Sequence, residues 1–455
     1  MDYIKIIILF LYYVGLLLLC CNVSKKILIT PEFCFVSSFV PHIFYALFYV
    51  KRWNLDINSD TFFVYLFGGM IFVLSSMSFS ILLGKVNLYS TASEKIVKID
   101  ISKWFLVGFV IFQVASLYIT MNAVRQLTNR PNILEAIDMF GFFSKGSGLQ
   151  MPSLPGKLNM ICYTSSYIWL YDILHSLQYK YKTHTFLLMI NLGLSVVHHV
   201  LTGSRGGVVE LLISGMVFVY FFRGDKKHWK NVIVMKSLIK GIIIGTIGIV
   251  LFRFSVELLG RTGIAGETIS DYIARYLSAS MKNLDTKIQN GAMGFQSIEQ
   301  WKTTNSIMST FSRIFGFNIE RNIGASSTYM SVNGFGLGNV YTIYYPFIND
   351  LSYLGLFIFI PIMSLVSQVI YKSALKFNRF NGNKPGASIT LVLYGYMISK
   401  IVFSFFSNRF YDNILSMGTI WCLLFWWIVK SCSEKNFVLF GNRIGIGKKH
   451  KHRNV

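Results

Sequence analysis

The run His198-His199-Val200-Leu201-Thr202-Gly203-Ser204-Arg205-Gly206-Gly207 joins two apolar stretches and holds one arginine among glycines. Glycines let backbone amides approach a ligand closely, and the run opens a helix. An arginine beside a helix N-terminus favours a phosphate, because the guanidinium fork and the free amides both point at the anion. The run therefore predicts a phosphate-binding turn around Arg205. The alternative is an ordinary glycine-rich turn, with its arginine at the membrane interface and both histidines hydrogen-bonded in the core.

A second cluster extends from Asn333 to Gly355 and reads N-G-F-G-L-G-N-V-Y-T-I-Y-Y-P-F-I-N-D-L-S-Y-L-G. Aromatic rings pack on the apolar faces of sugars, and carboxamides form hydrogen bonds with sugar hydroxyls. This mixture of residues is therefore typical of sugar binding. The alternative is an aromatic belt at the membrane interface. A belt does not explain three glycines within five residues, or Asp350 at the start of an apolar stretch.

Two charged residues lie inside apolar stretches. Glu210 follows Arg205 by about one and a half turns, and Lys400 lies roughly two turns from the end of its own stretch, so their depths are similar. A lone charge at such a depth is expensive. We therefore expect Glu210 and Lys400 to pair with each other or to line a wet cavity. Arg253 and Glu257 form a similar pair four residues apart.

The elements that carry these residues are membrane helices. Of the 455 residues, 53% are apolar and 14% charged, whereas soluble domains carry roughly 25% charged residues. This composition excludes a soluble multidomain enzyme, a coiled coil, a secreted disulfide scaffold and a disordered chain. A spanning helix needs roughly 20 apolar residues. About eleven such runs occur, near 4–20, 33–50, 61–83, 104–121, 158–175, 185–201, 206–222, 237–256, 351–371, 388–407 and 412–430.

The sequence thus predicts an all-α, polytopic integral membrane protein. Basic residues accumulate in alternate loops, which places those loops and a basic tail, 431–455, on the cytoplasmic side. The net charge of +23 is then a signal of topology and not of nucleic-acid binding. The same register places the N-terminus outside, together with a loop over 122–157 and a large loop over 257–350. All 455 residues are expected to form a single transmembrane domain.

The large external loop is expected to carry an amphipathic helix. Apolar residues recur at three and four positions between 269 and 288, with Asp271, Arg275, Lys282 and Asp285 on the other face. Thr268 followed by Asp271 predicts a capping box at its start. The helix lies either in the membrane interface or as a lid over an outer cavity. Arg275 is a candidate for the site, or a simple partner of Asp271 one turn away.

The sequence shows no pattern for a metal. Its six cysteines lie in or beside apolar runs without metal-ligand spacing, and we expect small buried hydrophobes or reduced thiols. Carboxylates do not cluster as metal ligands either. We expect neither a metal nor another cofactor.

The two clusters together resemble the O-antigen polymerase family, the polytopic bacterial proteins that join lipid-linked oligosaccharide repeat units. Sugar polymerases of this family often carry a G-S-R-G turn between two spans, here Gly203-Ser204-Arg205-Gly206. They later carry an N-V-Y-T stretch and an Asp at a span start, here Asn339-Val340-Tyr341-Thr342 and Asp350. Ser352 departs from the pattern, because the family usually has glycine there.

The resemblance implies a metal-independent membrane glycosyltransferase of lipopolysaccharide biosynthesis, at the periplasmic face of the bacterial inner membrane. Its donor would be a glycan on undecaprenyl diphosphate and its acceptor a single lipid-linked repeat unit. Membrane lipid would surround it, and a chain-length regulator and a flippase of the same pathway are its implied protein partners. A nucleic-acid partner is not expected.

The implied reaction assigns roles to particular residues. Cations must hold the diphosphate and stabilise it as it leaves, and the candidates are Arg205 with Gly206, then Arg253, Arg275 and Arg409. A general base must take the proton of the acceptor hydroxyl, and the candidates are Asp350, then His198, His199 and Glu257. The residues expected to position sugars are Asn339, Tyr341, Thr342 and Tyr345.

Two other functions stay open at this point. An O-antigen ligase uses the same donor but moves the finished glycan to a lipid A core, and the Asn339–Thr342 motif favours the polymerase over it. A lipid-linked oligosaccharide flippase performs no chemistry. The absence of a sequence repeat between the two halves and the long loop on one side argue against a flippase.

Overall fold

A computed structural model describes residues 2–24, 27–84, 99–146, 149–201, 206–226, 268–316, 329–380, 388–434, 436–439 and 442–445. The protein is mostly helical. The helices are α1 (Asp2–Val23), α2 (Pro31–Tyr49), α3 (Ser59–Leu82), α4 (Lys103–Thr128), α5 (Ile133–Gly146), α6 (Ser153–Tyr179), α7 (Thr185–Val200), α8 (Gly206–Lys226), α10 (Ile269–Leu277), α11 (Ala279–Gln289), α12 (Asn305–Phe315), α13 (Tyr344–Phe380), α14 (Ile389–Val402) and α15 (Met417–Ser433). The shorter elements are the 3₁₀ turns η1 (Ile298–Gln300) and η3 (Phe403–Phe405), the π-helical turn η4 (Phe410–Ile414), and the strands β1 (Met330–Val332), β2 (Phe335–Gly338), β3 (Asn436–Leu439) and β4 (Asn442–Gly445).

Several helices are long and apolar enough to cross a membrane. Six segments qualify within the described ranges, namely Tyr3–Val23, Pro31–Tyr49, Ser59–Leu82, Lys103–Thr128, Gly206–Gly224 and Tyr344–Lys376. Three shorter apolar helices accompany them, Thr185–Val200, Ile389–Phe405 and Met417–Ser433. The predicted span at 237–256 lies outside the described residues. The fold is thus compatible with an all-α membrane protein, and the figure of eleven spans stays a prediction.

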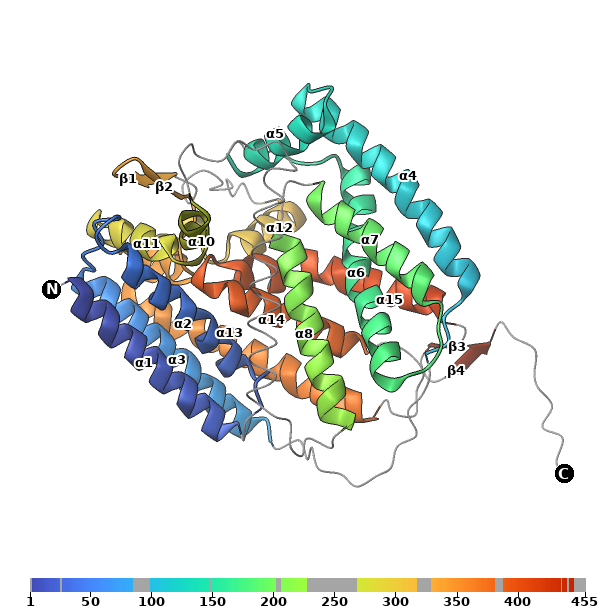
Figure 1. The fold of residues 1–455 in the computed structure, drawn as a ribbon, viewed down its shortest axis with the longest axis horizontal. Helices are drawn as coiled ribbons and strands as arrows, with labels where there is room; N and C mark the ends of the chain where they lie inside the picture. The colour runs from blue at the N-terminus through green and yellow to red at the C-terminus, as the bar shows by residue number, and fades with distance from the viewer. Residues whose placement is uncertain are drawn as a thin grey trace.

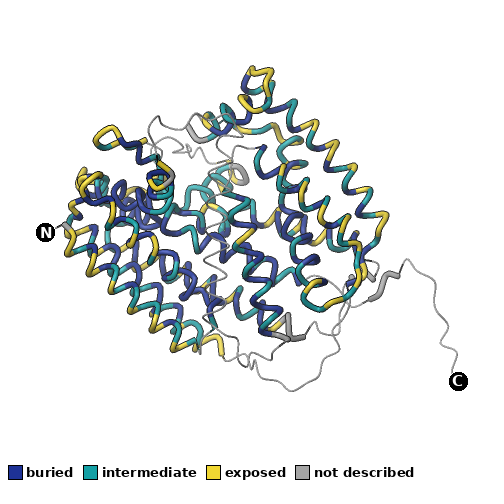
Figure 2. The backbone as a smooth tube through the Cα atoms, in the orientation of Figure 1, coloured by how far each residue is buried: buried dark blue, intermediate teal, exposed yellow. Residues whose placement is uncertain are grey.

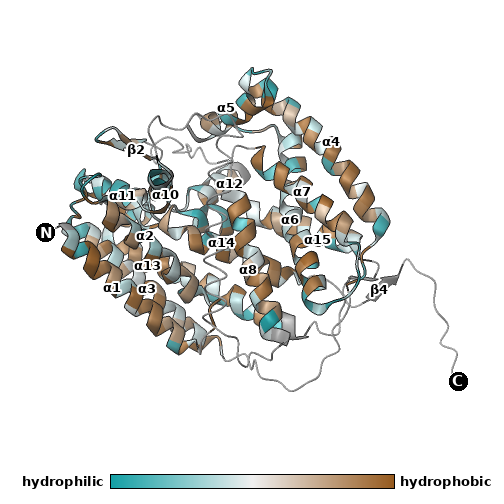
Figure 3. Ribbon diagram, viewed as in Figure 1, coloured by the Kyte–Doolittle hydropathy of each residue, from teal (hydrophilic) through white to brown (hydrophobic). Residues whose placement is uncertain are grey.

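The outer surfaces of α1 and α4 are apolar. Ile4, Leu11 and Leu18 repeat every seven residues along α1 and are 60% to 61% exposed. Trp104, Ile111 and Tyr118 repeat in the same way along α4 and are exposed as well. The exposed sides in Figure 2 correspond to hydrophobic stretches of the same helices in Figure 3. A helix that exposes a continuous apolar stripe is suited to lipid and not to water.

The segments predicted to be external gather at one end of the helix bundle. Figure 1 shows α5, α10, α11 and the β1–β2 hairpin along the upper edge of the view. Asn333 and Gly334 both have positive φ, 51° and 74°, and form the two-residue turn of this hairpin. Phe335 then lies between the guanidinium groups of Arg52 and Arg275, 4.8 and 5.6 Å from its ring centre. The first of the clustered glycines therefore serves a hairpin turn, which was not predicted.

The amphipathic helix predicted over 269–288 is in fact two helices. The chain breaks between α10 and α11 at Ser278, whose φ is −129° and whose hydroxyl donates to the carbonyl of His42 over 2.7 Å. The capping box at Thr268 and Asp271 is confirmed, with both reciprocal bonds at 3.1 Å.

The polar side of this segment packs against the bundle. Asp285 is fully buried and accepts hydrogen bonds from Thr61 Oγ1 and the Asn58 amide. Asp271 forms its ion pair with Arg52 of the α2–α3 connection. The polar side of α10 and α11 thus binds the bundle. In physical terms, buried carboxylates are tolerated here because each one has hydrogen-bond donors.

Helix α13 is interrupted near its start. Leu351 (φ −139°, ψ 24°) and Ser352 (φ 52°, ψ −147°) leave the helical region. The interruption frees carbonyl groups, and the external segment satisfies them, since the amide of Gly294 donates to Ile348 O and that of Gln296 to Asp350 O. The apolar helix therefore resumes after Ser352, close to the start at 351 expected from the sequence.

Replacing Ser352 by glycine should stabilise the protein. A positive φ with this ψ is strained for serine and easy for glycine, so we expect Ser352→Gly to raise the stability by about 1 kcal/mol. Thermal unfolding in detergent should show the higher Tm. Ser367→Gly, in the regular part of α13, is the matched control and should lower the Tm. Equal losses in the two variants would contradict the strain at Ser352.

Candidate functional site

The central feature of the site is a buried triad of charges. Glu210 of α8 accepts hydrogen bonds from the Lys400 ammonium of α14 and from the Arg409 guanidinium just before η4. The Glu210 and Lys400 side chains are only 6% and 5% exposed, and that of Arg409 is 23% exposed. The predicted pairing of Glu210 with Lys400 is thus confirmed, and Arg409 completes it. Two cations share one carboxylate, which leaves the triad with one excess positive charge.

The two glycines that begin α8 are needed for close packing. A Cβ on Gly206 would lie 2.7 Å from Arg409 Nη1, and one on Gly207 would lie 2.4 Å from His199 Nδ1. Any larger residue would therefore push the guanidinium or the imidazole away. The sequence suggested that these glycines admit a ligand, and in the structure they admit two side chains. Arg205 itself lies outside the described residues.

Arg409 is held in a position that suits an anion. Its guanidinium lies 4.4 Å from the ring centre of Phe403 and 5.7 Å from that of Phe406. The same group touches the first residue of α8, where the helix dipole is positive. Two positive ends therefore meet, and Glu210 neutralises only one of the two cations. This arrangement is complementary to an added anion such as a phosphate group.

The two predicted histidines contact different helices. His198 is fully buried, with Nδ1 2.7 Å from Asn159 Oδ1 and Nε2 3.1 Å from Gln113 O. It therefore joins α7 to α6 and α4, which corresponds to the core alternative. The His199 ring packs against Gly207 at the start of α8, next to the charge triad. Its Nε2 is 3.2 Å from Ser166 Oγ. Of the two, only His199 is next to the charged residues.

Asp350 is fully buried and its carboxylate is occupied. Oδ1 accepts from the amide of Lys302 over 2.9 Å, and Oδ2 accepts from the amide of Thr303 over 2.7 Å. The Asn349 side chain also donates to Oδ1, over 3.2 Å. The two backbone donors fix the carboxylate to the segment before α12, and Asn349 adds a third donor from α13 itself. In the structure, this side chain holds backbone and does not face open space.

The predicted sugar-binding residues form a compact aromatic group. The rings of Tyr341 and Tyr345 lie 4.8 Å apart between centres, and both residues are buried, as is Thr342. Lys302 Nζ donates to Tyr345 Oη over 2.9 Å and to Asn349 Oδ1 over 2.8 Å. Asn339 is the most accessible of the four predicted residues.

A short chain of hydrogen bonds connects the aromatic group with the charge triad. The amide of Thr303 donates to Asp350, and the carbonyl of Thr303 accepts a hydrogen bond from Asn408 Nδ2 over 3.3 Å. Asn408 directly precedes Arg409 in the chain. The amide of Ile343 donates to Ser404 O over 2.8 Å. The start of α13 and the segment that carries Arg409 are therefore brought together.

Buried oxygen atoms without a partner lie along this connection. Within the described part of the chain they include Thr303 Oγ1, Thr342 Oγ1, Ser404 Oγ and Asn408 Oδ1. Each costs free energy when it is buried without a hydrogen bond. Other buried polar atoms without a partner lie elsewhere in the described bundle, and the four here leave hydrogen-bonding capacity between the two polar clusters.

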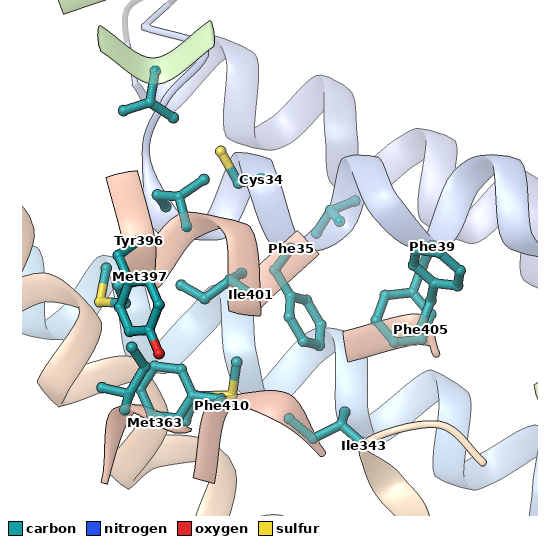
Figure 4. Close-up of a cluster of buried hydrophobic side chains, with 14 of the residues drawn as sticks. Cys34, Phe35, Phe39, Ile343, Met363, Tyr396, Met397, Ile401, Phe405 and Phe410 are labelled. Atoms are coloured by element: carbon teal, nitrogen blue, oxygen red, sulfur yellow. The ribbon is translucent and has the colours of Figure 1, made fainter. Parts of the chain in front are cut away.

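A dense apolar core supports this region. Figure 4 shows Phe35 and Phe39 of α2 near Met397 and Ile401 of α14, with Phe405 and Ile343 beside them. All of these side chains are buried. Since Ile401 and Phe405 lie between Lys400 and Arg409 in the chain, this packing helps to fix the positions of both cations. The site is thus built on rigid elements.

The remaining predicted residues are distributed as follows. Arg275 donates through Nε to Gly336 O over 2.7 Å, at the β1–β2 hairpin. Arg205, Arg253 and Glu257 lie outside the described residues. Within the described ranges, no three His, Cys, Asp or Glu residues gather as metal ligands.

The sequence analysis missed Lys302, Thr303 and Asn408. Lys302 and Thr303 had no signal, because they act through backbone amides and a long-range contact. Asn408 did have one, since Ser407-Asn408-Arg409 and Asp412-Asn413 form a polar stretch between two apolar helices. Such a stretch within a short connection is a usable indicator of a site at the end of a membrane helix.

The charge triad should show strong energetic coupling. Glu210→Gln leaves two buried cations without a carboxylate and should destabilise the protein by about 3–5 kcal/mol. The double variant with Lys400→Met should lose less than the sum of the single variants, with a coupling of about 1–3 kcal/mol. Reversible unfolding in mixed detergent measures both. Glu210→Gln with the exposed Lys182→Met should be additive, and additivity in the triad as well would contradict the pairing.

Comparisons with protein-family models, with curated proteins and with solved structures find no match for this chain. The resemblance to the O-antigen polymerase family therefore stays a prediction from two sequence motifs. What the structure adds is the arrangement of those motifs: a buried triad of charges at the start of α8, joined through Thr303 and Asn408 to an aromatic and polar group at the start of α13.

Proposed function

We propose that this protein is a membrane glycosyltransferase of the O-antigen polymerase type, which joins undecaprenyl-diphosphate-linked oligosaccharide repeat units. One observation carries the proposal. The Arg409 guanidinium lies against the positive end of α8, while Glu210 compensates only one of the two cations next to it. A bound diphosphate would neutralise both positive ends at once.

The cations have a clear role in such a reaction. The acceptor oxygen attacks the anomeric carbon of the donor, and the bond from that carbon to the phosphate oxygen breaks. Undecaprenyl diphosphate leaves with the electron pair, so negative charge develops on it. Arg409 and Lys400, fixed in a region of low dielectric, stabilise this charge without reorganisation. His199 lies next to them and holds the start of α8 through Gly207.

The aromatic group suits the glycan part of the substrates. The tilted rings of Tyr341 and Tyr345 pack together, and Lys302 joins them to one unit next to Asp350 through its hydrogen bond to Tyr345. Asn339 is half-buried and is the residue we assign to contact with a sugar hydroxyl. The buried residues of this unit then position the backbone around Asn339. Arg275 fixes the neighbouring hairpin through Gly336.

The proposal includes a location. The segments before and after the site are those that the basic-residue pattern assigns to the outside, so the site would face the periplasm from the inner membrane. Both substrates carry a lipid tail and would reach the site laterally from the outer leaflet. A chain-length regulator and a flippase of the same pathway are the proposed protein partners.

Loss of Arg409 should abolish polymer formation. Purified protein in lipid nanodiscs, given an undecaprenyl-diphosphate-linked repeat unit, should produce a ladder of glycan lengths on a gel. Arg409→Ala should lower the rate by about 10²–10³-fold, because it removes one stabiliser of the leaving group. Arg409→Lys should retain part of the rate, since it keeps the charge but loses the fork.

The control variant is Arg130→Ala, at an exposed position between α4 and α5. It should give the wild-type ladder. A folded wild-type protein that gives no ladder, or an undiminished ladder with Arg409→Ala, would overturn the proposed function. Transfer of whole chains to a lipid A core without a ladder would identify a ligase instead.

A further inference from the structure

A second carboxylate near Arg409 is not used by the fold. Asp412 lies in the π-helical turn η4, between Tyr411 and Asn413. Its neighbours Phe410 and Tyr411 are buried, and Tyr411 Oη donates to Phe359 O over 2.5 Å. They fix the turn, whereas the Asp412 side chain is exposed. π-Helical turns are rare and occur frequently at functional sites.

The surroundings of Asp412 are those of a base and not of a structural carboxylate. Within the described part of the chain, no residue donates a hydrogen bond to its side chain, and the Asp412 amide donates to Asn408 O over 3.2 Å. The side chain is exposed, so its carboxylate is open to a substrate and can accept a proton.

The other acidic side chains of the site are already engaged. Asp350 accepts three hydrogen bonds and is fully buried. Glu210 is bound by both cations of the triad. Neither is free to take a proton from a substrate hydroxyl without breaking contacts that hold the site. Asp412 is the carboxylate near Arg409 that combines access with the lack of a donor.

We propose that Asp412 is the general base of the glycosyl transfer. The inference rests on the proposed function. Asp412 takes the proton of the acceptor hydroxyl as its oxygen forms the bond to the anomeric carbon of the donor. The bond from that carbon to the diphosphate breaks at the same centre, and undecaprenyl diphosphate departs with the electron pair toward Arg409 and Lys400. The proton thus ends on Asp412, the acceptor oxygen is bonded to the anomeric carbon, and the diphosphate is released.

The spacing of the two residues supports this division of work. Arg409 and Asp412 belong to the same turn, three residues apart, and the positive charge of Arg409 acts on the Asp412 carboxylate. One rigid turn thus supplies the cation for the leaving group and the base for the nucleophile. Asn413 Nδ2 donates to Arg409 O over 2.8 Å and stiffens the same turn.

The test is Asp412→Asn, which keeps the shape of the side chain and removes the base. With the undecaprenyl-diphosphate-linked repeat unit in nanodiscs, we expect the initial rate of ladder formation to fall by about 10²–10⁴-fold. Binding of undecaprenyl diphosphate, measured by the shift in Tm, should stay as in wild type. Asp56→Asn, at an exposed position before α3, is the matched control and should keep the full rate.

A second variant makes the result independent of folding effects. Asp412→Ala should regain part of its rate when formate is added as an external base, and Arg409→Ala should not. An unchanged rate in Asp412→Asn, no rescue by formate, or a loss of undecaprenyl diphosphate binding would overturn the role of Asp412. In each of these cases a wild-type ladder that Arg409→Ala abolishes leaves the proposed function intact, whereas the lack of any wild-type ladder overturns the function itself.

Discussion

The architecture around the site depends on the buried carboxylate of Glu210. A charge within a membrane helix is stable only with a partner, and an ion pair that loses one member leaves a costly charge behind. Glu210 therefore fixes Lys400 of α14 and Arg409 of the following turn relative to α8. Helix α8 is thus joined to α14 and to the turn that follows it, about 190 residues further along the chain.

The glycines at the start of α8 follow from this constraint. Arg409 can reach Glu210 only by passing directly over Gly206, and His199 occupies the space over Gly207. The absence of two side chains is therefore as necessary as the presence of three charges. The same positioning brings a guanidinium to the positive end of a helix, which favours an anionic ligand. Stability and the proposed diphosphate binding thus share one cause.

Much of the fold could be predicted because lipid imposes simple rules. Hydrophobic runs of sufficient length identified the spanning helices, and the cost of a lone charge predicted the pairing of Glu210 with Lys400. The capping box at Thr268 was likewise readable, since its two partners are three residues apart. These features depend on local spacing or on a general energetic penalty.

Other features could not be read because distant backbone groups decide them. The break at Ser278 depends on the carbonyl of His42, and the engagement of Asp350 depends on the amides of Lys302 and Thr303. Hydropathy carries no signal for either contact. Asp350 therefore looked like a free carboxylate in the sequence, whereas Asp412, in an unremarkable polar stretch, is the accessible one.

Three irregularities of the backbone meet at the site: the start of α8, the interruption of α13 after Asp350, and the π-helical turn η4. Hydrogen bonds connect their neighbourhoods, through Arg409 to Glu210 and through Asn408 to Thr303. Lipid does not tolerate unpaired backbone groups, so irregular chain at membrane depth is found where protein buries it or where it lines a space open to water. Buried hydroxyl and amide oxygens without partners accompany these three points. The bundle therefore brings irregular backbone, some of its unpaired oxygens and its excess cation to one place, and a charged, hydroxyl-rich substrate would find there the partners that the apolar helices cannot supply.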